Sequence, residues 1–90
     1  MGRGTDRQTR RVVTLYGAPD CHLCHDALAK LRRLGALFAF DIEEINVHTD
    51  PDLVAQFGIR IPVVAVGNRI VLESKVTEFR LLKLLPALLS

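Results

Sequence analysis

The stretch that decides the fold is Tyr16-Gly17-Ala18-Pro19-Asp20-Cys21-His22-Leu23-Cys24-His25. It holds the only two cysteines of the chain, Cys21 and Cys24, three positions apart. An apolar run precedes them and a helical pattern follows them, so one turn of helix brings both sulfurs to the same edge. The spacing therefore predicts a dithiol that can close into a disulfide.

The composition around this stretch indicates one small domain. The 90 residues are 49% hydrophobic, which is enough for a single core. Twelve Lys and Arg against ten Asp and Glu leave a net charge of +2, too weak to indicate nucleic acid or a membrane as a partner. Residues 1–11 hold four arginines and no apolar run, so we expect a flexible tail there and a single domain over residues 12–90.

The sequence also predicts the cellular compartment of the protein. No apolar stretch approaches the roughly 20 residues needed to cross a bilayer, and the N-terminus has no secretory apolar region. We therefore expect a cytoplasmic protein. In that reducing compartment, paired cysteines are more often catalytic or metal-binding than structural.

The first half of the domain predicts a strand, a helix and a second strand. Residues 12–16 are β-branched, apolar or aromatic and end at a glycine, which is typical of a buried strand. Asp20 is a suitable N-cap for a helix that begins at Cys21, and Gly35 is a suitable stop. The apolar alternation of residues 40–47 is broken by Glu43-Glu44, so we expect this second strand at a sheet edge.

The next segments predict a short helix and a hairpin. Asp50-Pro51 suits the N-cap and the first position of a helix. Two apolar runs, residues 61–66 and 69–72, flank Gly67-Asn68, a two-residue connection whose types favour positive φ. This pattern indicates a tight antiparallel turn.

The C-terminal segment predicts a last helix with a wide apolar face. Ser74 or Thr77 can cap it, and Pro86 is expected to bend or end it. The apolar face consists of Phe79, Leu81, Leu82, Leu84, Leu85 and Leu88. This face is wider than one sheet can cover, so the helix is a candidate surface for a weak homodimer.

This order of elements resembles the thioredoxin fold of small glutaredoxin-like proteins. The similarity rests on the segment from Tyr16 to Cys24 and on Phe57-Gly58-Ile59-Arg60-Ile61-Pro62, which is similar to the segment before the thioredoxin cis-proline. The resemblance implies an α/β fold of β-α-β-α-β-β-α order, with a four-stranded mixed sheet flanked by helices. It also implies that the Ile61–Pro62 bond is cis and faces the dithiol. Tyr16, Ile61 and Pro62 would then contact the substrate, with the Ile61 backbone free to pair with a substrate strand.

The chemistry of a dithiol needs one thiolate, because only the thiolate attacks a disulfide. The free N–H groups at a helix start favour an anion at Cys21, while Cys24 lies one turn further in. We therefore expect a thiol–disulfide oxidoreductase with Cys21 as nucleophile and Cys24 as resolver. His22 and His25 can lower the pKa of Cys21, and Asp20 opposes them as a like charge. The alternative is that both imidazoles are only solvated at the helix start.

The same segment allows two other interpretations. Its cysteines and histidines are potential ligands of zinc or, across a dimer, of an iron–sulfur cluster, so a metal or cluster carrier is the alternative function. Adjacent residues on a helix diverge by about 100°, however, so a closed site would require the helix start to unwind, and we predict no bound metal. Cys-x-x-Cys-His also matches a c-type haem attachment motif, but Met1 is the only methionine available as a second ligand.

The expected partner is a disulfide-bearing protein or a small thiol, with no bound cofactor. The electron donor would be glutathione or a protein dithiol supplied by a reductase. Glutathione-binding glutaredoxins commonly carry a lysine three residues before the first cysteine, where this chain has Ala18. They also carry a Gly-Gly-x-x-Asp segment after the hairpin, where this chain reads Leu72-Glu73-Ser74-Lys75-Val76. The sequence therefore predicts weak glutathione binding, because paired charges hold such a ligand in register.

Overall fold

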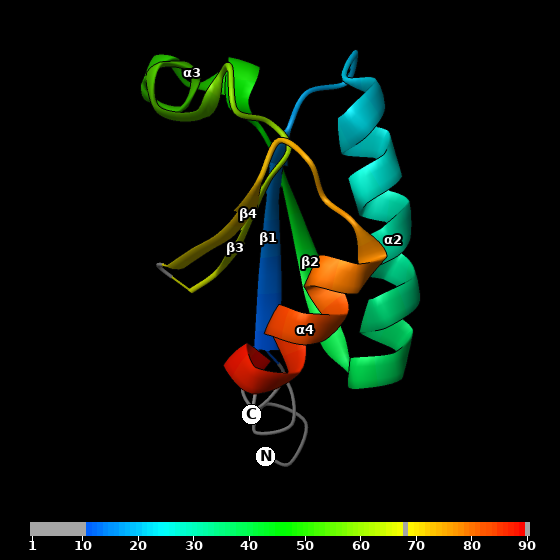
Figure 1. Cartoon of the computed structure of the whole chain (residues 1–90). Helices are drawn as coiled ribbons and strands as arrows, with labels where there is room; N and C mark the ends of the chain where they lie inside the picture. The colour runs from blue at the N-terminus through cyan, green and yellow to red at the C-terminus, as the bar shows by residue number, and fades with distance from the viewer. Residues whose placement is uncertain (1–10, 68, 90) are drawn as a thin grey trace, which may run out of the picture.

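The computed structural model describes residues 11–67 and 69–89, with side chains described as far as residue 84 (Figure 1). In chain order the elements are β1 (Arg11–Gly17), α2 (His22–Phe38), β2 (Phe40–Asn46), η1 (Val47–Thr49), α3 (Pro51–Phe57), β3 (Val63–Val66), β4 (Arg69–Glu73) and α4 (Glu78–Leu89). This is the predicted order, with the single-turn 3-10 helix η1 added. Arg11, expected in the tail, is the first residue of β1, because its backbone is in register with Phe40. The rest of the expected tail lies outside the described residues.

The four strands form one mixed sheet in the order β2-β1-β3-β4. β1 is parallel to β2 and antiparallel to β3, and β4 is antiparallel to β3. A parallel pair needs a long crossover, and α2 supplies it between β1 and β2. The predictions of a mixed sheet and of β2 at its edge are therefore confirmed.

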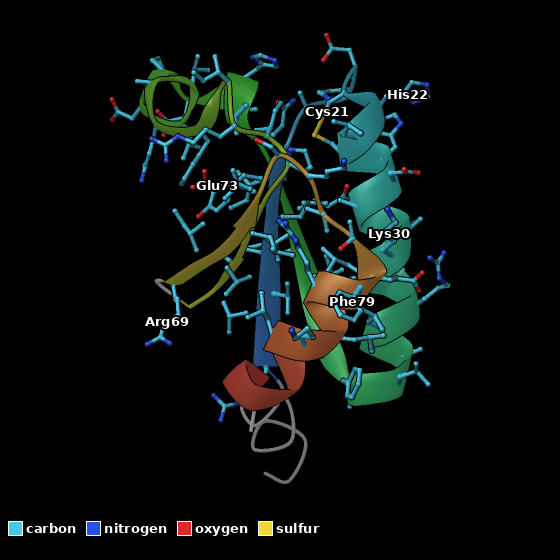
Figure 2. The ribbon with its side chains drawn as sticks, viewed as in Figure 1. Cys21, His22, Lys30, Arg69, Glu73 and Phe79 are labelled. Carbon is cyan, nitrogen blue, oxygen red and sulfur yellow. A yellow bond between two sulfur atoms is a disulfide. The ribbon has the colours of Figure 1, made fainter. Side chains whose placement is uncertain are left out.

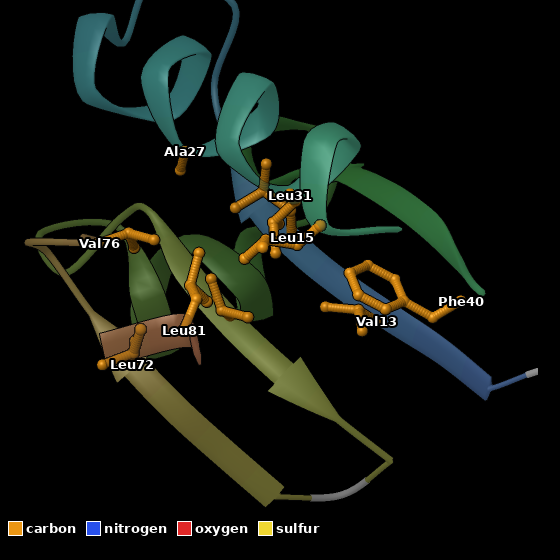
Figure 3. Packing of buried hydrophobic residues seen from close by; sticks show 10 residues of the cluster. Val13, Leu15, Ala27, Leu31, Phe40, Leu72, Val76 and Leu81 are labelled. Carbon is orange, nitrogen blue, oxygen red and sulfur yellow. The ribbon is translucent and has the colours of Figure 1, made fainter. Parts of the chain in front are cut away.

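The main hydrophobic core lies on one face of the sheet, which α2 and α4 cover (Figures 1 and 3). Alternation along β1 directs Val13 and Leu15 to this face, while Tyr16 belongs to the opposite one. The buried residues of the core are Val13, Leu15, Ala27, Leu31, Leu34, Phe40, Val64, Leu72, Val76 and Leu81. They join α2 and α4 to β1, β3 and β4, and to Phe40 at the start of β2.

A second, smaller cluster fills the opposite face near the end of β1. It consists of Val47, Phe57 and Val63, with Tyr16 among the half-buried side chains packed against it. The rings of Tyr16 and Phe57 lie 4.5 Å apart between centroids. This contact ties α3 to the end of β1 that leads into the cysteine segment.

Both predicted ends of α2 are wrong. The N-cap is Cys21 rather than Asp20, because the Sγ of Cys21 accepts a hydrogen bond from the backbone N–H of Cys24 at 3.2 Å. The helix also runs past Gly35 and ends at Phe38, where Ala39 takes a left-handed conformation with φ of 59°. Gly35 is needed for close packing instead, since a Cβ there would lie 3.2 Å from the carbonyl oxygen of Phe40.

The structure confirms predicted caps for α3 and α4. Asp50 caps α3 through its carboxylate, which accepts from the N–H of Asp52 at 2.9 Å. Thr77, rather than Ser74, caps α4, because its hydroxyl oxygen accepts from the N–H of Arg80 at 3.2 Å. Gly67 has φ of 61°, as the hairpin requires, and its neighbour Asn68 lies outside the described residues.

The last helix exposes much of its predicted apolar face. α4 continues to Leu89, so Pro86 does not end it. Leu81 is fully buried, whereas Phe79, Leu82 and Leu84 are exposed. The side chains of Leu85 and Leu88 lie outside the described part of the chain. No helix within the described ranges is long and apolar enough to cross a membrane.

The core packing predicts a large difference between two leucines of α2. Leu31 is 0% exposed and Leu37 is 74% exposed. We expect Leu31→Ala to lower the free energy of unfolding by about 2–5 kcal/mol, because it leaves a cavity between α2 and the sheet. The matched variant Leu37→Ala should change it by less than about 0.5 kcal/mol. Urea denaturation of both variants measures the difference, and equal losses would contradict this packing.

Candidate active site

The site begins where β1 ends. The chain turns after Gly17, with the N–H of Cys21 donating to the carbonyl of Ala18 at 3.2 Å, and α2 begins at His22. Cys21 and Cys24 are joined by a disulfide, with their Cα atoms 5.2 Å apart (Figure 2). The turn and the first turn of the helix thus hold both sulfurs together at one end of the sheet.

The two cysteines occupy different environments. Cys24 is only 4% exposed, whereas Cys21 is half-buried. The Cys21 sulfur also lies at the start of α2, where it accepts from the N–H of Cys24, a donor that it shares with the Cys21 carbonyl. Such donors favour a negative charge at this atom. The geometry therefore distinguishes an accessible sulfur at the helix cap from a buried one behind it.

Gly17 is a site residue that the sequence did not identify. A Cβ at this position would lie 3.0 Å from the Sγ and 3.1 Å from the Cβ of Cys24, closer than side chains normally pack. The absent side chain leaves room for the buried cysteine. In the sequence, Gly17 stands at the end of a predicted strand just before the dithiol. That position indicates only where the strand ends and gives no sign of a contact with Cys24.

The three residues predicted to tune Cys21 are placed differently from one another. The Nε2 of His25 donates to the carbonyl oxygen of Pro19 at 2.8 Å, so its ring is held against the turn. His22 and Asp20 are exposed, and His22 projects from the start of α2 away from the disulfide (Figure 2). Of the three, only His25 is fixed by a hydrogen bond that the structure shows.

The Ile61-Pro62 segment lies at the same end of the sheet as the dithiol (Figure 1). The Ile61–Pro62 peptide bond is cis, Pro62 is buried and Ile61 packs beside Tyr16 in the smaller cluster. The N–H of Ser74 donates to the carbonyls of Arg60 and Pro62, at 2.9 and 2.8 Å. Among the described residues, no hydrogen bond is made by the N–H or the carbonyl of Ile61.

Ser74 is the second residue that the sequence analysis missed in this role. The sequence offers it as a helix cap, but its φ is 63° and its N–H ties the end of β4 to the segment around Pro62. A serine directly after a predicted strand gives no specific signal for such a contact. Only the spatial pairing of β3 with β4 brings it there.

A cavity of about 290 Å³ lies beside the buried cysteine, between the start of α2 and the end of β2. Its lining residues are Leu15, Gly17, Ala18, Pro19, Cys24, His25, Glu44, Ile45 and Asn46. No group of three or more His, Cys, Asp or Glu side chains is placed to hold a metal ion in the described part of the chain.

Comparison with known proteins defines the class of the fold. A solution structure of protein Ne2328 from Nitrosomonas europaea is 28% identical over 90% of this chain and 93% of that one, with a TM-score of 0.74. The X-ray structure of protein XcR50 from X. campestris is 31% identical over 83% of this chain and 96% of that one, with a TM-score of 0.66. Thioredoxin 1 from Thermosipho africanus is 19% identical over 84% and 96% of the two chains, with a TM-score of 0.56, which shows the fold alone. The protein is an α/β protein with a thioredoxin-like fold.

The family follows from the sequence. Residues 12–86 match the model of the Glutaredoxin-like domain (DUF836), which covers more than half of the chain. The chain belongs to this glutaredoxin-like family, as the resemblance in its sequence predicts. No curated protein matches the chain. Family membership and the closely placed pair of Cys21 and Cys24 support a thioredoxin-like redox role.

The close approach of Gly17 to Cys24 predicts a coupled effect on stability. Gly17→Ala should lower the free energy of unfolding of the oxidised protein by about 1–3 kcal/mol, because the added methyl overpacks the site. In a background with both cysteines changed to alanine, the same substitution should cost less, since the sulfur it meets is gone. Denaturant unfolding of the four proteins gives the coupling, which we expect to exceed about 0.5 kcal/mol. Equal losses of unfolding free energy in both backgrounds would show that the added methyl group does not clash with the Cys24 sulfur.

Proposed function

We propose that this protein is a thiol–disulfide oxidoreductase in which Cys21 is the nucleophile and Cys24 the resolver. The observation that carries the proposal is the asymmetry of the pair: the accessible sulfur is the helix cap, and the buried sulfur lies directly behind it. A merely structural disulfide does not need one sulfur held at a helix start and open to a partner. The reducing cytoplasm expected from the sequence is where such a dithiol would be maintained.

The proposed reaction consists of two exchanges. The Cys21 thiolate attacks one sulfur of a substrate disulfide, that bond breaks, and the leaving thiolate takes up a proton. The Cys24 thiolate then attacks the Sγ of Cys21, the mixed disulfide breaks, and the second substrate thiol leaves. The substrate gains two electrons and the protein ends with the Cys21–Cys24 disulfide. A donor dithiol, or two molecules of a small thiol, returns it to the reduced form.

The helix start supports the choice of Cys21. The sulfur that accepts the N–H of Cys24 in the disulfide is the atom that would carry the thiolate after reduction. Free backbone donors and the positive end of the helix dipole stabilise that anion relative to the thiol. Cys24 has little exposure through which an external disulfide could reach it.

The segment around Pro62 is the proposed substrate groove. The N–H and carbonyl of Ile61 make no hydrogen bond within the described ranges, so both are available to an extended substrate strand. Pro62 adds no further donor beside the site, because proline has no backbone N–H. Tyr16 packs on Phe57 and helps to hold this edge, so its role is to shape the groove.

For the electron donor, we propose a protein dithiol in preference to glutathione. Ala18 is buried and uncharged at the position where glutaredoxins commonly carry a lysine. Arg60, a potential substitute, is paired with the carboxylate of Glu73 at 3.3 Å. Val76, which stands where that segment of glutaredoxins ends in Asp, is buried and carries no charge to hold an ammonium group. These contacts leave few paired charges for a tripeptide ligand.

The asymmetry predicts opposite outcomes for the two cysteine variants. Cys21→Ser should abolish reduction of an insulin-type protein disulfide, whereas Cys24→Ser should accumulate a mixed disulfide, because attack remains and resolution is lost. Mass spectrometry after non-reducing separation detects that adduct. Equal alkylation rates of the two thiols in the reduced protein would contradict the assignment of nucleophile and resolver. Stoichiometric zinc or iron held by them in the purified protein would favour a metal carrier instead.

The missing charges predict poor coupling to glutathione. In a glutathione-coupled reductase assay, turnover should rise almost linearly with glutathione and show no saturation at ordinary cellular concentrations. A thioredoxin-type reductase or a reduced protein dithiol should support faster turnover. Ala18→Lys is the informative variant, since it adds one of the missing cations and should lower the glutathione concentration for half-maximal rate. Saturation of the unaltered protein would refute the argument.

A further inference from the structure

Ser74 holds a backbone conformation that its side chain disfavours. Its φ is 63°, in the left-handed region that residues with a Cβ rarely adopt. Across it, the N–H of Lys75 donates to the carbonyl of Glu73 at 2.6 Å, the pattern of a rare and strained γ-turn. Ala39 is the other non-glycine residue with positive φ in the described ranges, and there the conformation ends α2. No helix ends at Ser74, so its conformation has a different cause.

The turn at Ser74 aims one backbone donor at two acceptors. The N–H of Ser74 donates to the carbonyl oxygens of Arg60 and Pro62, at 2.9 and 2.8 Å. The Ser74 hydroxyl adds only a long contact of 3.4 Å to the same Arg60 carbonyl. The backbone N–H is therefore the part of Ser74 that joins the end of β4 to the segment before β3 (Figure 1).

These two bonds orient the backbone of the residue between the two carbonyls, Ile61. The carbonyl of Arg60 and the N–H of Ile61 belong to one planar trans peptide group and point in opposite directions. Because Ser74 holds that carbonyl, the N–H of Ile61 is turned away from Ser74. The carbonyl of Ile61 lies between this held peptide group and the held carbonyl of Pro62. Neither backbone group of Ile61 makes a hydrogen bond in the part of the chain that the structure describes.

We propose that Ser74 is a positioning residue for protein substrates, because its N–H orients the two backbone groups of Ile61 that pair with a substrate strand. The inference rests on the proposed function and specifies its substrate class, which is a disulfide whose cysteine lies in an extended segment of chain. Such a segment adds to exposed backbone groups through its own N–H and carbonyl. A small disulfide that lacks a peptide backbone gains nothing from this orientation.

Two probes with the same leaving group separate backbone pairing from thiol chemistry. One is 5,5′-dithiobis(2-nitrobenzoate), and the other is a short peptide whose single cysteine carries the same nitrothiobenzoate group in a disulfide. With either probe, the Cys21 thiolate attacks a sulfur, a disulfide to Cys21 forms, the probe disulfide breaks and one coloured thiolate leaves. The ratio of the two initial rates of colour release, peptide over small disulfide, measures the contribution of the peptide backbone. A third probe is the same peptide N-methylated at the residues that flank its cysteine, which removes its donors.

The substitutions change the conformation of residue 74 without changing its charge. Ser74→Val keeps the N–H but disfavours positive φ strongly, since its side chain is β-branched, so the donor should leave the two carbonyls. We expect the rate ratio to fall roughly tenfold, as the loss of two hydrogen bonds implies. Ser74→Gly adopts positive φ freely and should keep the ratio of the unaltered protein. Ala39→Val is the matched control, because it places the same strain at the end of α2 and should leave the ratio unchanged.

The outcomes distinguish this inference from the function on which it depends. If the unaltered protein releases colour from neither probe, the proposed oxidoreductase function fails. If it reacts with both probes but equally fast with the peptide and its N-methylated form, only the pairing at Ile61 and the role of Ser74 are overturned. An unchanged ratio in Ser74→Val, or an equal fall in Ala39→Val, also overturns that role. A lower ratio in Ser74→Val alone, with N-methylation no longer slowing that variant, supports it.

Hydrogen exchange of the Ser74 amide tests the two bonds without any substitution. In the unaltered protein we expect exchange at least roughly tenfold slower than that of a free amide, because the N–H is held by two carbonyls. Exchange at the rate of a free amide would overturn the inference even if Ser74→Val did not fold.

Discussion

The hydrogen bond from the N–H of Cys24 to the sulfur of Cys21 is the contact on which the site depends. One atom thereby caps α2 and forms the accessible half of the disulfide. A helix start has several free N–H groups that need an acceptor, and side-chain oxygens usually supply it. Here the sulfur of Cys21 is an acceptor, so this atom is held where the backbone favours an anion.

The sheet brings the parts of the site together because the parallel strands β1 and β2 end at the same edge of the sheet. The parallel pairing of β1 with β2 requires α2 as the crossover, and that helix must start at the end of β1. The same pairing sets Gly17 beside Asn46, so the polar end of β2 reaches the dithiol. The antiparallel hairpin then brings Ser74 to the carbonyls on either side of Ile61. The cysteine pair therefore shares its end of the sheet with the Pro62 segment and has a cavity on its β2 side.

The two sides of the cysteine pair differ in what they expose. On the Pro62 side, the N–H and the carbonyl of Ile61 make no hydrogen bond in the described part of the chain. On the β2 side, Cys24 lines a cavity together with His25 and Glu44. Cys21 is half-buried and Cys24 is almost fully buried, so the two sulfurs differ in their access to solvent.

Local sequence determined the elements and the dithiol, because strand runs, turn residues and the three-residue cysteine spacing act over short distances. It also determined the cap at Asp50 and limited the cap of α4 to Ser74 or Thr77, because a capping side chain bonds to a nearby N–H group. Tertiary structure alone decided that α2 passes Gly35, since the need for glycine there comes from contact with Phe40 on the following strand. It likewise decided the contacts of Gly17 with Cys24 and of Ser74 with the carbonyls of Arg60 and Pro62. Each depends on a neighbour brought close by folding, and no pattern along the chain encodes that proximity.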